Sequence, residues 1–293
     1  MSDSLESLNR KMGGAHDLAS VVRTMKALAA SSIGQYEAAV RSLGDYYRTV
    51  ELGLVACIKQ NHTAPLAGGE RTQSGAIGAV VFGSDQGLVG QFNDVLAGFA
   101  VSALAAMPGE KQVWAVGERV RSRLADAGLP IAGLFPVPNS VSAITPLVGD
   151  IQVKLEASRA ASPYSVLYLF HNSPGPAATY LPASQRLLPL DEQWRRELSK
   201  LSWPTGNLPE VIGSDESVAR ALIREYLFVS LFRICAESLA SENSSRLVAM
   251  QRAEKNIDDL LVTLTRNFNR LRQSSIDEEL FDVISGFEAL SGP

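Results

Sequence analysis

A glycine-rich stretch, GSDQGLVGQFN at residues 83–93, follows a short apolar run and leads into a segment with helical spacing. A loop that joins a strand to a helix can bind phosphate, because its amide groups and the positive end of the helix dipole both face the anion. The Walker A pattern GxxxxGK[ST] is absent, since the sequence has no Gly-Lys pair. The dinucleotide pattern GxGxxG fails as well, because Asp85 stands where its first glycine is needed. We therefore expect a tight turn that uses Gly83, Gly87 and Gly90, and no bound cofactor.

Metal sites and catalytic nucleophiles are not indicated either. The three histidines, His16, His62 and His171, have neither HExxH nor paired spacing. The two cysteines, Cys57 and Cys235, are 178 positions apart, which is the spacing of neither a CxxC metal site nor a disulfide framework. We expect no catalytic site and no metal site in this chain.

Charge and hydropathy exclude further classes of protein. The net charge of −4 and the pI near 5.5 do not fit a nucleic-acid binder, which usually carries a basic face. The N-terminus MSDSLESLNRKM is polar, and no stretch reaches the roughly 18 apolar residues of a membrane span. We expect a soluble chain that is not exported, lies in a reducing compartment and is not inserted into a membrane.

The ends of the chain predict two long helices. Residues 5–60 carry apolar positions at helical spacing without a proline, although Gly13 and Gly14 weaken the first turns. Residues 214–290 also lack proline, and their apolar residues alternate in steps of three and four, interrupted at Glu254. This stripe consists of Leu247, Met250, Ile257, Leu261, Leu264, Phe268 and Leu271. It predicts a left-handed coiled coil whose partner is the N-terminal helix.

The middle of the chain predicts an α/β sheet. Short apolar runs, AIGAVVFG, QVWAVG, LPIAGLFPV and SVLYLFH, alternate with helical segments such as 93–107 and 118–127. The stretch 179–190 adds an edge strand, where its prolines are tolerated. Residues 61–75 are rich in Pro and Gly and are predicted to be a linker. We therefore divide the chain into an N-terminal coiled-coil helix (1–62), an α/β domain (63–212) and a C-terminal coiled-coil helix (213–293).

Three segments resemble the gamma subunit of F-type ATP synthases. The loop GSDQGLVGQFN is similar to the family's SDRGLCGxxN signature, and VVRTMKALAAS resembles its KAMKMVAAS segment. The tail SENSSRLVAMQRAEKN, followed by NRLRQSSIDEELFDVISG, resembles the family's C-terminal helix. The resemblance runs in order from Leu8 to Leu290 and implies an antiparallel coiled coil of the terminal helices with a Rossmann-like domain that binds no nucleotide.

The resemblance also implies a function. The chain would be a non-catalytic rotor, the central stalk, that turns inside a ring of alpha and beta subunits. It would rest on the epsilon subunit and on the membrane ring of c subunits, at the cytoplasmic side of the inner membrane. It places contacts with beta at Met25, Lys26, Arg246, Arg272 and Gln273. The turn loop with Gly83, Asp85, Gly87 and Gly90 is expected near the beta subunits.

The sequence departs from the family pattern at several positions. Gln86 replaces the loop arginine, Asp277 replaces a common threonine, and residues 1–60 hold seven Lys plus Arg against six Asp plus Glu where the family is basic. These changes indicate a divergent branch.

Other interpretations stay open. The chain could be a small-molecule α/β enzyme with an oligomerisation arm, or a structural tether that uses its helices as a spacer. At the residue level, Arg246 and Gln273 could be ordinary surface groups on an exposed helix.

Overall fold

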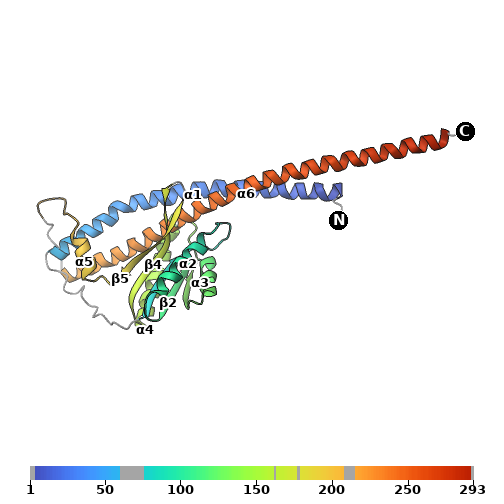
Figure 1. Cartoon of the computed structure of the whole chain (residues 1–293). Coiled ribbons are helices and arrows are strands. Elements are labelled where there is room, and N and C mark those ends of the chain that lie inside the picture. Colours follow the sequence, from blue (N-terminus) through green and yellow to red (C-terminus); the bar gives the residue numbers. More distant parts are fainter. Residues whose placement is uncertain (1–3, 60–75, 162, 177–178, 208–214, 292–293) are drawn as a thin grey trace. The chain divides into compact units, whose positions relative to one another are not determined.

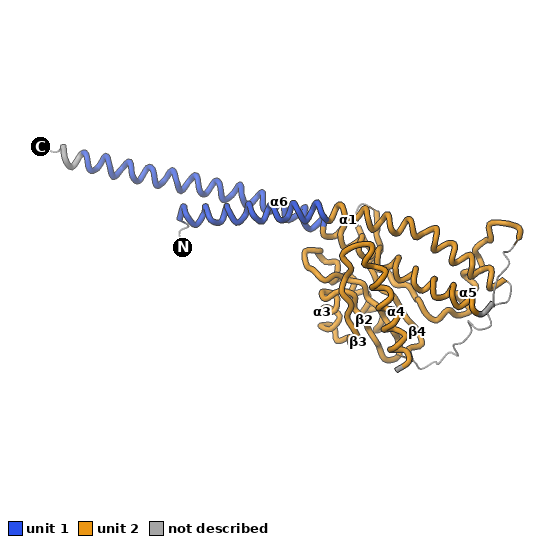
Figure 2. The backbone as a smooth tube through the Cα atoms, turned by 180° about the vertical axis from the view of Figure 1, so that it is seen from behind, with its two compact units in different colours: residues 1–28, 247–293 blue, residues 29–246 orange. Residues whose placement is uncertain are grey.

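The fold is described from a computed structural model of the chain, for residues 4–59, 76–161, 163–176, 179–207 and 215–291. The two longest elements are α1 (Leu5–Lys59) and α6 (Asp215–Ser291), where the helical spacing predicts them. The described residues form two compact units, shown in Figure 2: unit 1 comprises 1–28 and 247–293, and unit 2 comprises 29–246. This division differs from the three predicted domains, because both long helices contribute to both units. The predicted linker at 61–75 lies outside the described residues.

Unit 2 contains a mixed five-stranded sheet with the order β3-β2-β1-β4-β5 (Figure 1). The strands are β1 (Ala76–Phe82), β2 (Lys111–Val116), β3 (Ile131–Phe135), β4 (Tyr164–Pro174) and β5 (Tyr180–Leu188). β1 pairs in parallel with β2 and β4, β2 pairs in parallel with β3, and β5 pairs antiparallel with β4 at the edge. All four apolar runs are strands, and β5 is the edge strand predicted at 179–190, with Pro182 in it. The predicted α/β sheet is confirmed.

Helices cover both faces of this sheet. α2 (Phe92–Ala105) and α3 (Glu118–Asp126) pack on one face, where Leu96, Leu104 and Leu124 are fully buried against alternate residues of β1 and β2. α4 (Ile144–Ala161) packs on the opposite face together with parts of α1 and α6. The sequence patterns did not predict α4 or the short α5 (Glu192–Ser199). Pro146 and Gly149 obscure the helical pattern of α4, but the proline lies in the first turn, where its missing N–H has no helical partner to lose.

The two long helices run antiparallel within unit 2. The Tyr46 hydroxyl donates a hydrogen bond to Glu225 at 2.8 Å, whereas Tyr36, ten residues earlier, packs in the cluster that contains Leu239. The residue numbers of the contacting residues on α6 therefore decrease as those on α1 increase. Leu54, Val55 and Tyr226 form a further apolar cluster with α5. The helix pair thus becomes part of the core of unit 2.

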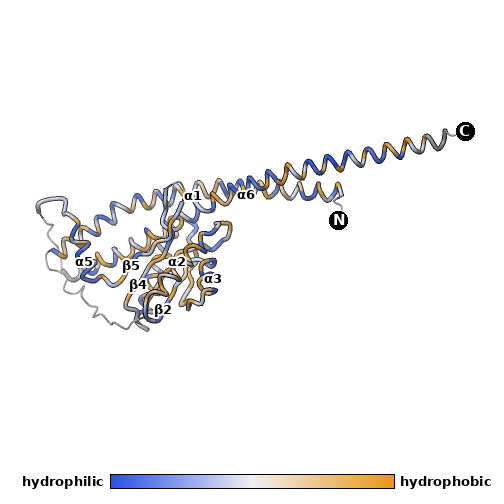
Figure 3. The backbone as a smooth tube through the Cα atoms, in the orientation of Figure 1, coloured by the Kyte–Doolittle hydropathy of each residue, from blue (hydrophilic) through white to orange (hydrophobic). Residues whose placement is uncertain are grey.

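In unit 1 the stripe on α6 has the burial that its heptad spacing predicts. Met250 and Leu264 are buried, and the other predicted stripe residues are intermediate, while the positions between them are mostly exposed. From α1, Ala15 and Ala19 are buried in the same unit. Figure 3 shows hydrophobic and hydrophilic residues interleaved along both helix segments. The antiparallel pairing is confirmed here too, since Lys26 binds Glu254 and a groove is lined by Leu18 and Leu260.

Candidate functional site

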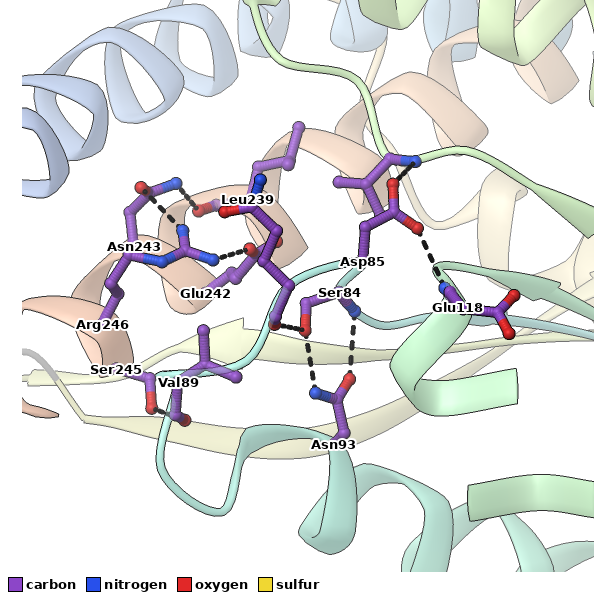
Figure 4. A network of polar contacts seen from close by, with 12 residues as sticks. Ser84, Asp85, Val89, Asn93, Glu118, Leu239, Glu242, Asn243, Ser245 and Arg246 are labelled. Carbon is purple, nitrogen blue, oxygen red and sulfur yellow. Dashed lines mark hydrogen bonds and ion pairs between the residues drawn. The ribbon is translucent and has the colours of Figure 1, made fainter. Parts of the chain in front are cut away.

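The glycine-rich loop follows β1 at the carboxyl edge of the sheet. The order β3-β2-β1-β4 reverses direction at β1, and this is where open α/β sheets usually bind ligands. The loop is held by its own side chains, since Asn93 Oδ1 accepts from the Ser84 amide at 3.0 Å and Asn93 Nδ2 donates to Ser84 Oγ at 2.8 Å (Figure 4). The Gly83 amide donates to the Val116 carbonyl at 2.8 Å. Two amides that an anion would need are therefore already used.

Asp85 joins three segments of unit 2. Its Oδ1 accepts from the Glu118 amide at 2.9 Å, at the first residue of α3, and its Oδ2 accepts from the Val137 amide at 2.8 Å, just after β3. A carboxylate at a helix N-terminus is stabilised by the exposed amides and the helix dipole. Asp85 therefore acts in this structure as a bridge between the loop, α3 and the segment after β3.

The three glycines of the loop differ in what they allow. A Cβ on Gly83 would lie 2.3 Å from Val120 Cβ, so this glycine permits the close approach of α3. Gly90 has a φ of +56°, which glycine adopts at little cost. Gly87 has neither feature, and a Cβ there would meet only the end of the Arg119 side chain at 3.7 Å. Leu88, in the same loop, also has a left-handed backbone, with a φ of 62°, and is 61% exposed. The sequence patterns did not identify it.

α6 covers the crevice at the carboxyl edge of the sheet. Ser238 Oγ donates to the Phe82 carbonyl at 2.8 Å, and Ser245 Oγ donates to the Val89 carbonyl at 2.6 Å. All four of these residues are buried, and so is the stretch 238–245 as a whole. The place where a nucleotide would lie in a doubly wound sheet is thus taken by a helix of the same chain. The helical spacing of α6 did not predict this contact.

Arg246 is bound within unit 2. Its Nη2 lies 2.5 Å from Glu242 Oε1, and its Nη1 donates weakly to Asn243 Oδ1 at 3.4 Å (Figure 4). The Arg246 and Glu242 side chains are only 13% and 6% exposed, so the interpretation of Arg246 as an ordinary surface group is wrong. Burial raises the pKa of Glu242, and the Arg246 charge opposes that rise. Glu242 Oε2 and Arg246 Nε are buried without a hydrogen-bond partner.

The other predicted contact residues belong to unit 1. Met25 is half-buried, whereas Arg272 and Gln273 are exposed on α6. The Lys26 ammonium donates to Glu254 Oε2 at 2.6 Å, so Glu254, the interruption in the predicted stripe, has a cation opposite it. The sequence singled out Glu254 without identifying its partners.

A largely buried polar pair joins β4 to α6. His171 Nε2 is 2.9 Å from Glu237 Oε2 on α6, and Arg233 Nε lies 3.3 Å from Glu237 Oε1. Burial alone would raise the pKa of Glu237, but the hydrogen bond and charge of His171, with the Arg233 charge, lower it below its ordinary value. No group of three or more His, Cys, Asp or Glu side chains suited to a metal ion occurs among the residues that the structure describes.

Within the described ranges, none of the helices combines the length and apolarity that crossing a bilayer requires.

Comparison with known proteins gives concordant results over nearly the whole chain. The profile of the family described as ATP synthase matches residues 4–290. The chain is 26% identical over 292 residues to the ATP synthase gamma chain of Hydrogenobaculum sp. (strain Y04AAS1), covering 98% of both chains. It is 28% identical over 305 residues to that of Syntrophus aciditrophicus (strain SB), covering 98% of this chain and 99% of the other.

Solved structures share the fold. A rotor chain of the Euglena gracilis mitochondrial ATP synthase aligns over 93% of this chain and 98% of its own length, with a TM-score of 0.63 at 17% identity. A chain from the central stalk and c-ring structure of the Tetrahymena thermophila mitochondrial enzyme aligns over 80% of this chain, with a TM-score of 0.59 at 21% identity. The chain belongs to the ATP synthase family, in which the relatives that it matches from end to end are gamma chains.

Proposed function

We propose that this chain is the central-stalk rotor subunit, gamma, of an F-type ATP synthase. It transmits ion-driven rotation of the membrane ring to the catalytic beta subunits for ATP synthesis or hydrolysis. The observation that carries the proposal is the family match across residues 4–290, which includes both helices of the antiparallel coiled coil as well as the sheet domain. A tether would need only the helices, and an enzyme would need a site in the sheet.

The chain's own contribution is mechanical in this proposal. A rotor acts through contacts that differ between the conformations of its partners, since only a difference in interaction free energy shifts their equilibrium. The crevice at the carboxyl edge of the sheet is taken by Ser238 and Ser245 of α6, which supports a subunit without a nucleotide of its own. The chemistry then resides in the beta subunits.

The partners proposed are the alpha and beta subunits of the ring, the epsilon subunit and the membrane ring of c subunits. The chain lies peripherally at the cytoplasmic side of the inner membrane and binds no nucleic acid. Arg272 and Gln273 are exposed and available to a beta subunit, as is part of Met25. Lys26 and Arg246 already bind carboxylates of this chain, so beta must share or displace those contacts.

Native mass spectrometry of the chain expressed with candidate alpha and beta subunits tests the proposal. We expect an assembly of three alpha, three beta and one copy of this chain. A matched control lacks residues 247–293, which removes the α6 segment of unit 1 and leaves the sequence of unit 2 intact. Failure of the full chain to join any alpha and beta pair from the same genome would overturn the rotor function.

A further inference from the structure

Glu254 occupies a position of the α6 stripe where the heptad pattern calls for an apolar residue. Its carboxylate is 21% exposed and accepts two hydrogen bonds from α1. Oε1 accepts from Arg23 Nε at 3.1 Å, and Oε2 accepts from Lys26 Nζ at 2.6 Å. Arg23 and Lys26 are three residues apart, so they lie on adjacent turns of one face of α1. Each oxygen of one carboxylate therefore has its own cation from the opposite helix.

The apolar contact beside this network is thin. The α1 residues buried towards its N-terminal side are Leu8, Ala15 and Ala19. The two that lie nearer to the network are alanines, whose small side chains bury little apolar area. There the helices leave a groove of about 610 Å³, whose lining includes Leu18, Val21 and Leu264. The apolar seam therefore holds this part of unit 1 weakly, which raises the relative importance of the ionic contacts.

We propose that Glu254 is a positioning residue that pins the α1 and α6 segments of unit 1 to each other and sets the direction of the Lys26 ammonium. A polar residue at one core position of a coiled coil selects the pairing in which it finds partners, at some expense of stability. Glu254 has two such partners, Arg23 and Lys26, and only a helix that presents cations on adjacent turns supplies both. The inference concerns the free chain and holds whether or not beta contacts Lys26.

The titration of Glu254 follows from this geometry. The hydrogen bonds from Lys26 and then from Arg23 lower its pKa below the ordinary value, and the two charges act in the same direction. A carboxylate with a lowered folded pKa stabilises the folded state above its unfolded pKa, and this contribution is lost as the pH falls through the folded pKa. Asp258 is the other acid that faces this network, with Oδ1 4.0 Å from Arg23 Nη2. The pin is therefore intact at neutral pH and released in acid.

Hydrogen exchange of the full chain tests the pin through charge reversal and rescue. Glu254→Lys places three cations together, so amides of residues 5–28 and 247–275 should exchange about threefold faster or more. The triple variant Arg23→Glu, Lys26→Glu, Glu254→Lys restores opposite charges and should return the exchange towards the wild-type rate. Higher salt should speed exchange there in the wild type and not in Glu254→Leu, whose seam is apolar.

The matched control is Glu6→Gln, which breaks an exposed pair with Arg10 on α1 of the same unit without linking the two helices. It should leave exchange in 247–275 unchanged. Wild-type exchange in Glu254→Lys would overturn the proposal, and so would a triple variant that exchanges as fast as the single one, because a role in packing alone is not rescued by swapping charges.

Discussion

Replacing Arg246 by alanine separates its role inside the chain from its predicted contact with beta. The guanidinium is 13% exposed and binds Glu242, which is 6% exposed. Removing it leaves a buried carboxylate whose Oε2 already has no hydrogen-bond partner. Breaking a buried ion pair by deleting one partner typically costs about 3–5 kcal/mol, against a total stability on the order of 5–15 kcal/mol. We expect Arg246→Ala to lose stability on this scale at neutral pH.

The loss should depend on pH. Burial raises the pKa of Glu242 while Arg246 lowers it, so deleting Arg246 raises that pKa further. A carboxyl with a raised folded pKa binds its proton more tightly in the folded state, and stability is therefore gained as the pH falls through that pKa. The deficit of Arg246→Ala relative to the wild type should shrink on acidification. Adding Glu242→Gln removes the uncompensated charge and should restore most of the stability at neutral pH.

Urea denaturation followed by tryptophan fluorescence measures these differences, because Trp114, Trp194 and Trp203 all lie in unit 2 with the ion pair. ATP hydrolysis by the reconstituted complex is the second measurement. A contact with beta predicts that Glu242→Gln plus Arg246→Ala is stable yet turns over about ten- to a hundredfold more slowly, as expected for a charge-assisted hydrogen bond. Wild-type turnover would restrict Arg246 to a structural role. A stability within about 0.5 kcal/mol of the wild type for Arg246→Ala would refute the buried-pair reasoning.

Three further predictions concern the loop at residues 83–93, the glycines and nucleotide binding. Asp85→Ala should lower the free energy of unfolding by about 1.5–3 kcal/mol, since the amides of Glu118 and Val137 lose a charged acceptor; urea denaturation measures it, and unchanged stability would contradict the bridge. Gly13→Ala should stabilise α1 by about 0.5–1 kcal/mol, because the new Cβ meets nothing within 4 Å, whereas Gly83→Ala should destabilise the fold, because its Cβ would collide with Val120. Thermal melts followed by circular dichroism should show a higher melting temperature for Gly13→Ala and a lower one for Gly83→Ala than for the wild type. The purified chain should bind no ATP at micromolar concentrations, because α6 takes the crevice; saturable heat in calorimetry would disprove this.

Local patterns in the sequence predicted most elements of this fold. The steps of three and four in residues 247–271 depend only on helical geometry, and in the structure Met250 and Leu264 are buried and the other stripe positions are partly buried. The apolar runs became strands because short continuous apolar segments between turn residues are typical of buried strands. α4 was missed because Pro146 and Gly149 mask a helix that the sheet stabilises from outside.

The interactions that define the candidate site lie between segments far apart in the chain. Ser84 and Asp85 were recognisable as a motif, but packing in three dimensions assigns Asp85 to the ends of α3 and β3 and places Ser238 and Ser245 over the loop. The same holds for Glu254, since its disruption of the heptad was visible while its pairing with Lys26, 228 positions away, was not. Periodicity is a property of neighbouring residues and can be read along the chain. A hydrogen bond or ion pair between distant segments depends on how separate elements pack, and no spacing in the sequence encodes the distance between the two side chains.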